Sequence, residues 1–516
     1  MHRSELLILI LFLCSHVFSQ EAETARFEVS RWGKEQDFHF ESFQERGGMA
    51  VYATDQTDAD KNRLWNFVQL DSSLYEQRSD MIPLPGRMRF FDSRSSSQWA
   101  AFVFLDEKVS RSDSVPVLVV AYNRLEQSFA TFSDMFPERS ALLSIAMIDG
   151  TLMLAVNRKT GSGFLSQYDL SSHQHRVITP EIGNEYVLFQ FETVREGRSF
   201  VVAVKEFVEK RYRSTSFLVY SREGRLLQRH RFDHGEHSSL GRMCFAFDAS
   251  QQLMVYATLE RESNRKIDVE GLVEDFNRTA VGVMWIKFAT EGLQTRAYLF
   301  KDFPDIDKAL TPSDRLRVRE ALLKMQQGKK KEKGEIAFQF LTPRLTSFGG
   351  LKVFVAEAFQ PVYHTETRME YGFHGTYPMH YTIFDGYDFF SEILLAFDDN
   401  GDLQWQTSVR FENDLNDQLV SHAMEAVVHD ELVVASPCRH KLRYEVFDHD
   451  GKPLLDQQTV RMDFLLGADT FEDEYEAGIF PWYRDCFLVH GCQLLQNGIL
   501  CNPRRVVFYV QKMQYQ

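Results

Sequence analysis

The feature that most constrains the fold of this chain is a repeated pair of strands. Seven segments each contain a β-rich strand, a tight polar turn and a second strand of alternating polarity. Four of the turns contain Glu-Gly, Asn-Gly or Asp-Gly, which tolerate the positive φ angles of a hairpin. The segments are 66–83, 117–134, 164–179, 216–232, 281–300, 393–409 and 443–460. Another hairpin precedes each segment, so the predicted unit has four strands.

The spacing of these segments predicts propeller blades. Their starts lie about fifty residues apart, apart from a double-length interval that contains two non-repeating insertions, 301–334 and 361–390. Short antiparallel four-stranded units at a steady period predict an all-β fold, a single β-propeller with eight four-stranded blades. A seven-bladed ring is the alternative. The last blade lacks its fourth strand, and we expect the N-terminal strand 27–32 to complete it and to cover the open sheet edge.

The N-terminus predicts export. Residues 1–19 have a polar start, a short apolar run and small residues before a cleavage site, which is the pattern of a signal peptide. The run is too short to span a bilayer, and no later run approaches that length. Residues 20–516 should therefore form the propeller in the periplasm, at the cell surface or outside the cell. Lipidation at Cys14 is not expected, because the bulky Leu13 precedes it.

Charge and composition limit the partners. The net charge of -15 argues against nucleic acid, since a phosphate-binding surface needs clustered Lys and Arg. The one basic run, 329–333, is flanked by glycines and is interpreted as a solvated loop. The high aromatic content, 13%, suits pleated strands around a packed core. We expect a monomeric scaffold without cofactors.

The long connections concentrate on one predicted face of the propeller. They include the insertions 260–278, 301–334 and 361–390 and the acidic loop 468–478, whereas the turns on the opposite face are nearly all short. Binding residues favour loops on a rigid scaffold, so this face is the predicted functional surface. The insertion 301–334 should be helical, with Thr311 as its cap and Pro312 in its first turn. Its apolar stripe should dock on the propeller rim, or bind a partner. The stripe comprises Val318, Ala321, Leu322 and Met325.

The insertion 361–390 is the main candidate binding site. Aromatic side chains with polar tips are typical of surfaces that recognise peptides or stack on sugars. The predicted binding residues are Tyr363, Tyr371, Phe373, Tyr377, Tyr381 and Tyr387. A lid packed on itself is one alternative. A metal or catalytic centre is another, although the histidines at 364, 374 and 380 lack short ligand spacing.

Two smaller clusters are candidate ion sites. His230, Asp233, His234 and His237 crowd one connection and predict a zinc site, with ordinary solvated loop chemistry as the alternative. Asp58, Asp60 and Asn62 alternate as in a calcium loop, although Arg63 and Gln69 stand where Gly and Glu are wanted.

The cysteines leave two alternatives open. Cys486 and Cys492 lie six residues apart on one predicted strand and cannot bridge each other. A bridge from Cys492 to Cys501 across the turn at 496–498 is geometrically allowed in an oxidising compartment. Small buried thiols are the other interpretation.

No catalytic signature is present in the sequence, such as Gly-x-Ser-x-Gly, His-Glu-x-x-His or a phosphate loop. We therefore expect a non-enzymatic binding module or assembly scaffold of the cell envelope that recognises a protein or glycan. The alternative is a polysaccharide-active enzyme with carboxylates in the central funnel. Converging acids would favour the enzyme, and a funnel filled by Phe and Tyr would favour the scaffold.

Two resemblances complete the sequence analysis. Residues 396–405, AFDDNGDLQW, resemble one blade of quinoprotein-like propellers, but the other blades lack this motif. The chain as a whole resembles uncharacterised exported β-propeller proteins of Bacteroidota. The shared features are Tyr387-Asp388-Phe389 before a hairpin and Pro481-Trp482-Tyr483 before a final strand at 507–510. This resemblance implies an envelope location and no known activity.

Overall fold

The computed structural model describes most of the chain. It covers residues 25–515 except 32–36, 107–113, 159–161, 184, 195–197, 209–210, 235–237, 262–278, 327–335, 342, 373–374, 417–418, 484 and 499–503. The predicted signal peptide, with Cys14, and nearly all of the insertion 260–278 lie outside the described residues. The described chain is all-β, as the repeat predicted, with only short helical segments.

The strands form antiparallel sheets of consecutive strands. Within the described residues there are seven four-stranded sheets and one five-stranded sheet. The first four sheets contain β2 (Phe38–Ser42), β3 (Gly48–Thr57), β4 (Arg63–Leu70) and β5 (Glu76–Leu84); β6 (Met88–Ser95), β7 (Trp99–Asp106), β8 (Val115–Asn123) and β9 (Ser128–Phe136); β10 (Ser140–Ile148), β11 (Thr151–Arg158), β12 (Ser162–Asp169) and β13 (Gln174–Ile178); and β14 (Glu185–Val194), β15 (Ser199–Val208), β16 (Arg211–Ser221) and β17 (Leu226–Asp233).

The remaining sheets follow the same pattern, with one addition. They contain β18 (Ser238–Phe247), β19 (Leu253–Arg261), β20 (Ala280–Ala289) and β21 (Gly292–Leu299); β22 (Gln339–Phe340), β23 (Arg344–Phe348), β24 (Leu351–Gly372), β25 (Gly375–Phe397) and β26 (Leu403–Asn416); β27 (Met424–Val428), β28 (Glu431–Pro437), β29 (Lys441–Phe447) and β30 (Pro453–Arg461); and β31 (Asp469–Pro481), β32 (Cys486–Asn497), β33 (Arg504–Gln514) and β1 (Arg26–Ser30). Both β22 and β23 pair with β24 in the five-stranded sheet.

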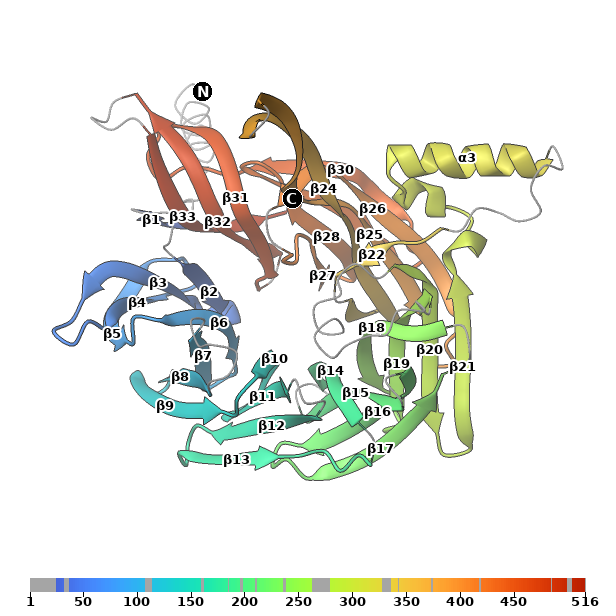
Figure 1. The fold of residues 1–516 in the computed structure, drawn as a ribbon, viewed down its shortest axis with the longest axis horizontal. Coiled ribbons are helices and arrows are strands. Elements are labelled where there is room, and N and C mark those ends of the chain that lie inside the picture. The colour runs from blue at the N-terminus through green and yellow to red at the C-terminus, as the bar shows by residue number, and fades with distance from the viewer. Residues whose placement is uncertain are drawn as a thin grey trace, which may run out of the picture.

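The sheets are arranged around a common centre, with the first strand of most sheets innermost (Figure 1). Eight clusters of buried apolar side chains fill the spaces between successive sheets. One cluster joins the first sheet, through Phe40 and Val68, to the last, through Leu488 and Val510. The second strand of a sheet is buried on both of its faces, which explains the nearly continuous apolar run of β15. The outer strands, such as β5, alternate in polarity because one face is solvated.

Asp residues shape the turns. Asp71, Asp398 and Asp448 each begin a turn, and one carboxylate oxygen accepts the backbone N–H groups two and four residues later. Gly401 has a φ of 76°, and a Cβ there would lie 2.2 Å from the Trp285 ring of the neighbouring sheet. Only Gly suits this turn.

The N-terminal strand pairs with the last strand of the chain. Residues Arg26 to Ser30 of β1 are in antiparallel register with Gln511 to Val507 of β33, so β1 is the outer strand of the last sheet. The Arg26 guanidinium is buried and bonds Glu28 (2.6 Å), Gln511 (2.7 Å) and Gln493 (2.8 Å). The strand predicted at 27–32 is thus present over its described residues.

The insertion 301–334 is helical where it is described, as predicted. It contains the 3-10 turns η2 (Phe300–Asp302) and η3 (Ile306–Ala309) and the helix α3 (Pro312–Gln326). Thr311 caps α3, because its hydroxyl accepts the Asp314 N–H at 3.2 Å. Val318 contacts the apolar cluster beneath, whereas the other three side chains of the predicted stripe lie outside the described residues. Among the described helices, none is both long and apolar enough to cross a membrane.

Two predicted loops are strands instead. The insertion 361–390 belongs to β24 and β25, which run for 22 and 23 residues. The acidic segment 468–478, expected to be a loop, lies mostly in β31. Local pattern failed in both places for the same reason: polar and aromatic residues that alternate in an exposed strand resemble a loop when no buried face marks the period.

Candidate functional site

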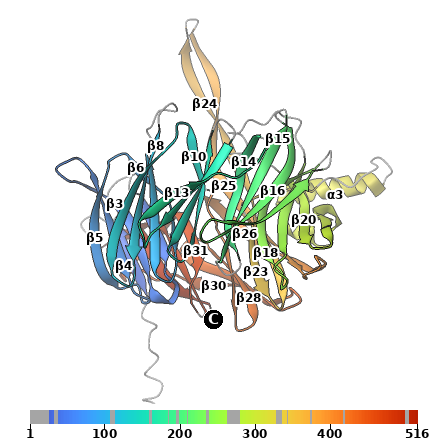
Figure 2. The ribbon, with the colours of Figure 1, turned by 90° about the horizontal axis from the view of Figure 1, so that it is seen from below.

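The hairpin formed by β24 and β25 extends beyond the ring of sheets (Figure 2). Its base is flanked by β22 and β23 on one side and by β26 on the other. The pairing of β25 with β26 ends at Tyr387, whereas its pairing with β24 continues to Gly375 opposite Gly372. Beyond this point the two strands project from the ring of sheets as an arm (Figure 2). We call residues 363–372 and 375–384 the arm.

The strand register gives the arm two different faces. Directly paired residues share a face, and successive residues alternate between faces. Tyr363 pairs with Phe384, and Tyr371 pairs with Thr376, so both pairs lie on one face. That face holds no Asp, Glu, Lys or Arg. It comprises Tyr363, Thr365, Thr367, Met369, Tyr371, Thr376, Pro378, His380, Thr382 and Phe384, and we call it the uncharged face.

The uncharged face is open to solvent. The exposed fractions of Tyr371, Met369 and Tyr363 are 91%, 60% and 56%. Phe384 at the foot of the arm is 42% exposed. Large apolar side chains are rarely gathered in this way on a surface that binds nothing.

The opposite face is charged and internally bonded. Arg368 pairs with Glu366 at 2.8 Å, and its guanidinium lies 5.7 Å from the Tyr381 ring centre. The Tyr381 hydroxyl donates a hydrogen bond to Glu370. These contacts hold the two strands together and satisfy much of the polar surface of this face.

The structure separates the six predicted binding residues. Tyr363 and Tyr371 lie on the uncharged face, and Tyr377 and Tyr381 lie on the charged face. Tyr387 lies at the base, with its ring 5.7 Å from that of Phe359, and Phe373 is outside the described residues. The lid interpretation is wrong, because the arm extends away from the sheets (Figure 2).

The two described histidines of the predicted zinc site, His230 and His234, have separate ring contacts. His230 and Asp233 belong to β17. The His230 ring stacks on Phe288 at 4.6 Å, while His234 bonds the Thr215 hydroxyl at 3.0 Å and lies against Tyr212. Burial lowers the pKa of His234 to about 3. His237 lies outside the described residues.

The predicted calcium residues form a turn. Asp58 accepts the N–H groups of Asp60 and Asn62, and the Asn62 side chain donates to its second oxygen at 2.9 Å. These bonds lower the pKa of Asp58. The same bonding occurs at Asp71 and Asp398, so it serves chain reversal. Among the described residues, no group of three or more Asp, Glu, His or Cys side chains is placed to hold a metal.

The thiol of Cys492 is buried and unbridged. It lies 3.4 Å from Glu476 and 3.5 Å from Arg31, and burial raises its pKa to about 12. Cys501, its proposed partner, lies outside the described residues. For Cys492 the buried-thiol interpretation fits the geometry.

A cavity of about 450 Å³ opens beside the inner strands β2, β6 and β31. Both acids and aromatic rings line it. The cavity therefore combines the acids expected of an enzyme with the aromatic rings expected of a scaffold. Its four acids all have donors: Asp37 pairs with Arg89, Glu41 with Ser93, Asp92 with Arg94, and Glu476 with Arg31. Burial raises the pKa of Glu41. Because each acid already has a hydrogen-bond or ion-pair partner, these carboxylates form a fixed polar lining and do not provide a free general acid and base.

Two histidines are buried in the same wall. The His39 ring stacks on Phe90 with centres 3.6 Å apart, and the His490 ring stacks on Phe480 at 4.9 Å. Burial lowers the pKa of His39 to about 3 and that of His490 to about 4. Both rings are therefore neutral aromatic surface at physiological pH.

A buried ion cluster borders this cavity. Arg344 of β23 bonds three glutamates, Glu357 and Glu392 at 2.6 Å and Glu425 at 2.9 Å. The second oxygen of Glu392 is buried without a hydrogen bond, and burial raises the pKa of Glu392 well above its usual range. A single arginine thus holds three carboxyl groups, which is consistent with a proton on Glu392.

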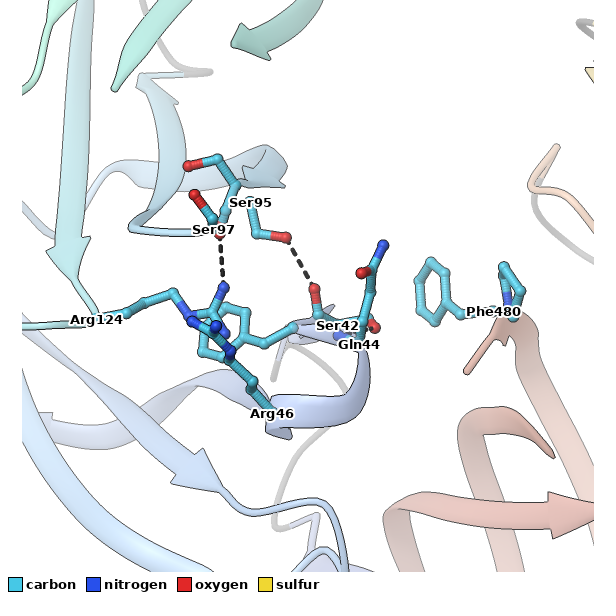
Figure 3. A pocket seen from close by; sticks show the side chains of 10 residues that line it. Ser42, Gln44, Arg46, Ser95, Ser97, Arg124 and Phe480 are labelled. Atoms are coloured by element: carbon cyan, nitrogen blue, oxygen red, sulfur yellow. Dashed lines mark hydrogen bonds between the residues drawn. The ribbon is translucent and has the colours of Figure 1, made fainter. Parts of the chain in front are cut away.

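A second pocket of about 420 Å³ lies at the short turns of the first, second and last sheets (Figure 3). Arg46 and Arg124 lie on one side and Phe480 on the other. Sequence reasoning missed it, because it searched the face with long connections. Nothing in the sequence relates two arginines that lie 78 positions apart; the pocket lining and Figure 3 bring them together.

Comparisons with known proteins identify no family. No family model and no curated protein matches the chain. Among solved structures, prolyl oligopeptidase B from Galerina marginata matches with a TM-score of 0.39 and 8% identity, over 88% of this chain and 56% of that one. The chain thus spans about half of that protein. The β-propeller domain of the trilobed protease from Pyrococcus furiosus gives 0.28 and 9%, over 72% and 98%. A hypothetical selenium-binding protein from Sulfolobus tokodaii gives 0.37 and 10%, over 81% and 92%.

Proposed function

We propose that this chain is an exported binding module that recognises a protein partner with the uncharged face of the arm. The observation that supports it most is the exposure of Tyr363, Met369 and Tyr371 on one face of a projecting hairpin. Exposed aromatic and Met side chains supply much of the binding energy at protein interfaces.

A protein fits the arm better than a glycan does. The arm lies beyond the pairing of β26, so its outer strand edges offer backbone N–H and C=O groups to a partner strand. Edge pairing gives affinity without charge, and the side chains of the uncharged face add contact area. The net charge of -15 keeps copies of the chain apart, which favours a different protein as the partner.

We further propose that the sheets form a closed eight-bladed propeller that holds the arm rigidly. The apolar cluster between the first and last sheets and the pairing of β1 with β33 support closure. A rigid base lowers the entropy that the arm loses on binding. The envelope location rests on the signal-peptide pattern of residues 1–19.

Substitutions on the two arm faces test the proposal. The variant Tyr363→Ala/Met369→Ala/Tyr371→Ala changes the uncharged face, and Tyr377→Ala/Met379→Ala changes the charged face without removing the contacts of Arg368. Both variants remove only exposed side chains, so neither should unfold the sheets. The measurement is photo-crosslinking in envelope preparations of the native host, with partner bands identified by mass spectrometry.

The proposal expects a defined band that the first variant loses and the second keeps. Equal loss from both variants would point to general stickiness and overturn the face assignment. Crosslinks from the first variant that match those of the wild type would overturn the arm as the binding site. A crosslink to a second copy of the chain would overturn recognition of a different protein.

The cavity beside β2, β6 and β31 gives less support to a polysaccharide-active enzyme. Its four acids are already hydrogen-bonded, whereas a general acid and base need a free carboxyl pair at the substrate. Binding therefore remains the function that the geometry favours.

A further inference from the structure

The second pocket differs in charge from the rest of this acidic chain. Its described lining contains two arginines, four serines, a glutamine and three apolar side chains, but no carboxylate. These residues are Ser42, Phe43, Gln44, Arg46, Ser95, Ser96, Ser97, Arg124, Phe480 and Pro481. In a protein with a net charge of -15, such a lining is a local reversal of sign.

The two guanidinium groups repel each other. Arg46 lowers the pKa of Arg124, in addition to the larger effect of burial. Arg124 stacks on the Phe43 ring at 4.4 Å and donates to the Ser96 carbonyl at 2.6 Å. Its charge therefore meets a ring face and a neutral oxygen, while Arg46 has an exposed side chain. Glu41 raises the pKa of Arg124, but it is not part of the pocket lining. Its carboxylate accepts a hydrogen bond from the Ser93 hydroxyl.

The turn that carries Arg46 is fixed by its backbone. The Phe43 N–H bonds the Gly47 carbonyl at 2.7 Å, and the Gly47 N–H bonds the Gln44 carbonyl at 3.1 Å. Gly47 has a φ of 96°, and a Cβ there would lie 2.0 Å from the Leu70 carbonyl oxygen. These bonds fix the backbone at Arg46, and the Arg46 side chain lies beside that of Arg124 (Figure 3).

We propose that this pocket binds a small anionic ligand whose phosphate, sulfate or carboxylate group lies between Arg46 and Arg124. Arginine forks match such oxyanions with paired, charge-assisted hydrogen bonds, and serine hydroxyls add further donors. The volume of about 420 Å³ exceeds what a bare oxyanion needs and is within the usual range of small-molecule sites. Phe480, across the pocket from the arginines, offers a ring face to the rest of the ligand (Figure 3). This inference is independent of the arm.

Calorimetric titration of the full mature chain tests the site. The probes are inorganic phosphate, inorganic sulfate, glucose 6-phosphate, glucose 6-sulfate and glucuronate, with glucose as the neutral probe. Titration at low salt, about 20 mM, limits the screening of the charges. Binding of the sugar derivatives but not of the inorganic ions identifies an oxyanion group that is part of a larger molecule. Binding of the inorganic ions with equal affinity identifies a free one. Both outcomes support the proposal.

Two exposed arginines make a matched pair of variants. Arg46→Gln should weaken anion binding about tenfold or more, because it removes a charged fork from the oxyanion. Arg198→Gln removes the same charge from a first-to-second-strand turn of another sheet and should leave affinity unchanged. Arg46→Lys, which keeps the charge but loses the fork, should fall between the wild type and Arg46→Gln.

Three results would overturn the proposal. They are the absence of binding by every anion, equal binding of glucose and its charged derivatives, and equal weakening by Arg46→Gln and Arg198→Gln. The last result would mean that the anions respond only to the overall charge. Because Arg46 is exposed, its replacement leaves the fold intact, and unchanged thermal unfolding of Arg46→Gln confirms this.

Discussion

Replacing Arg26 by Ala should destabilise the protein by about 3 kcal/mol. The guanidinium is fully buried where β1 joins β33, and it bonds Glu28, Gln493 and Gln511. Removing one partner of a buried ion pair costs about 3–5 kcal/mol. The lower end applies here, because Glu28 keeps a second bond to Arg505 at 3.0 Å.

Urea unfolding of the chain, followed by tryptophan fluorescence and far-UV circular dichroism, measures this loss. The control Arg222→Ala removes an ion pair with Asp149 whose side chains are 47% and 63% exposed, and it should cost less than about 1 kcal/mol. Deleting residues 25–31 should have a larger effect than Arg26→Ala, with aggregation, because it opens the edge of β33. Similar unfolding midpoints for Arg26→Ala and Arg222→Ala would refute the idea that the pairing of β1 with β33 stabilises the fold.

Three further perturbations probe buried groups. Cys492 should resist maleimide at pH 8 in the folded state and react in urea, as measured by peptide mass spectrometry, because burial raises its pKa to about 12; equal labelling in both states would contradict this. Stability should fall as pH drops from about 6.5 to about 4, because burial lowers the pKa of His490 to about 4 and only the unfolded chain binds a proton there in this range. His490→Gln should therefore reduce the slope of melting temperature against pH. Arg344→Ala should cost about 3–5 kcal/mol in urea unfolding, because it leaves three buried glutamates without their shared cation; a cost no larger than that of Arg222→Ala would contradict this.

The arm shows which features of the candidate site follow from the sequence and which need the structure. Tyr363 and Tyr371, predicted as binding residues, are exposed, and their role in binding stays a prediction. Met369 was not among the predicted residues, because only the strand register places it between them on the same face. The predicted residues Tyr377 and Tyr381 lie on the other face, a distinction that a period of two reveals only once the pairing is known.

The turn and pocket residues show a related limit. Asp58 and Asp60 have the spacing of metal ligands, yet the carboxylate of Asp58 bonds its own turn. The choice between the two chemistries depends on where the backbone N–H groups point. The pocket that contains Arg46 and Arg124 had no local signal in the sequence, since the two residues come from turns of two adjacent sheets.

Patterns in the sequence predict the all-β class, the four-stranded unit, the capped helix at Pro312 and the N-terminal strand that pairs with the last strand. These features depend on local periodicity, turn chemistry and capping, which act over a few residues and repeat along the chain. Strand pairing and sheet packing place 363–372 and 375–384 in a projecting arm, give His230 and His234 separate ring contacts, and bring Arg46 beside Arg124. Each of these depends on the register between strands or on the contact of separate sheets, and neither quantity is encoded in the spacing of residues along one segment.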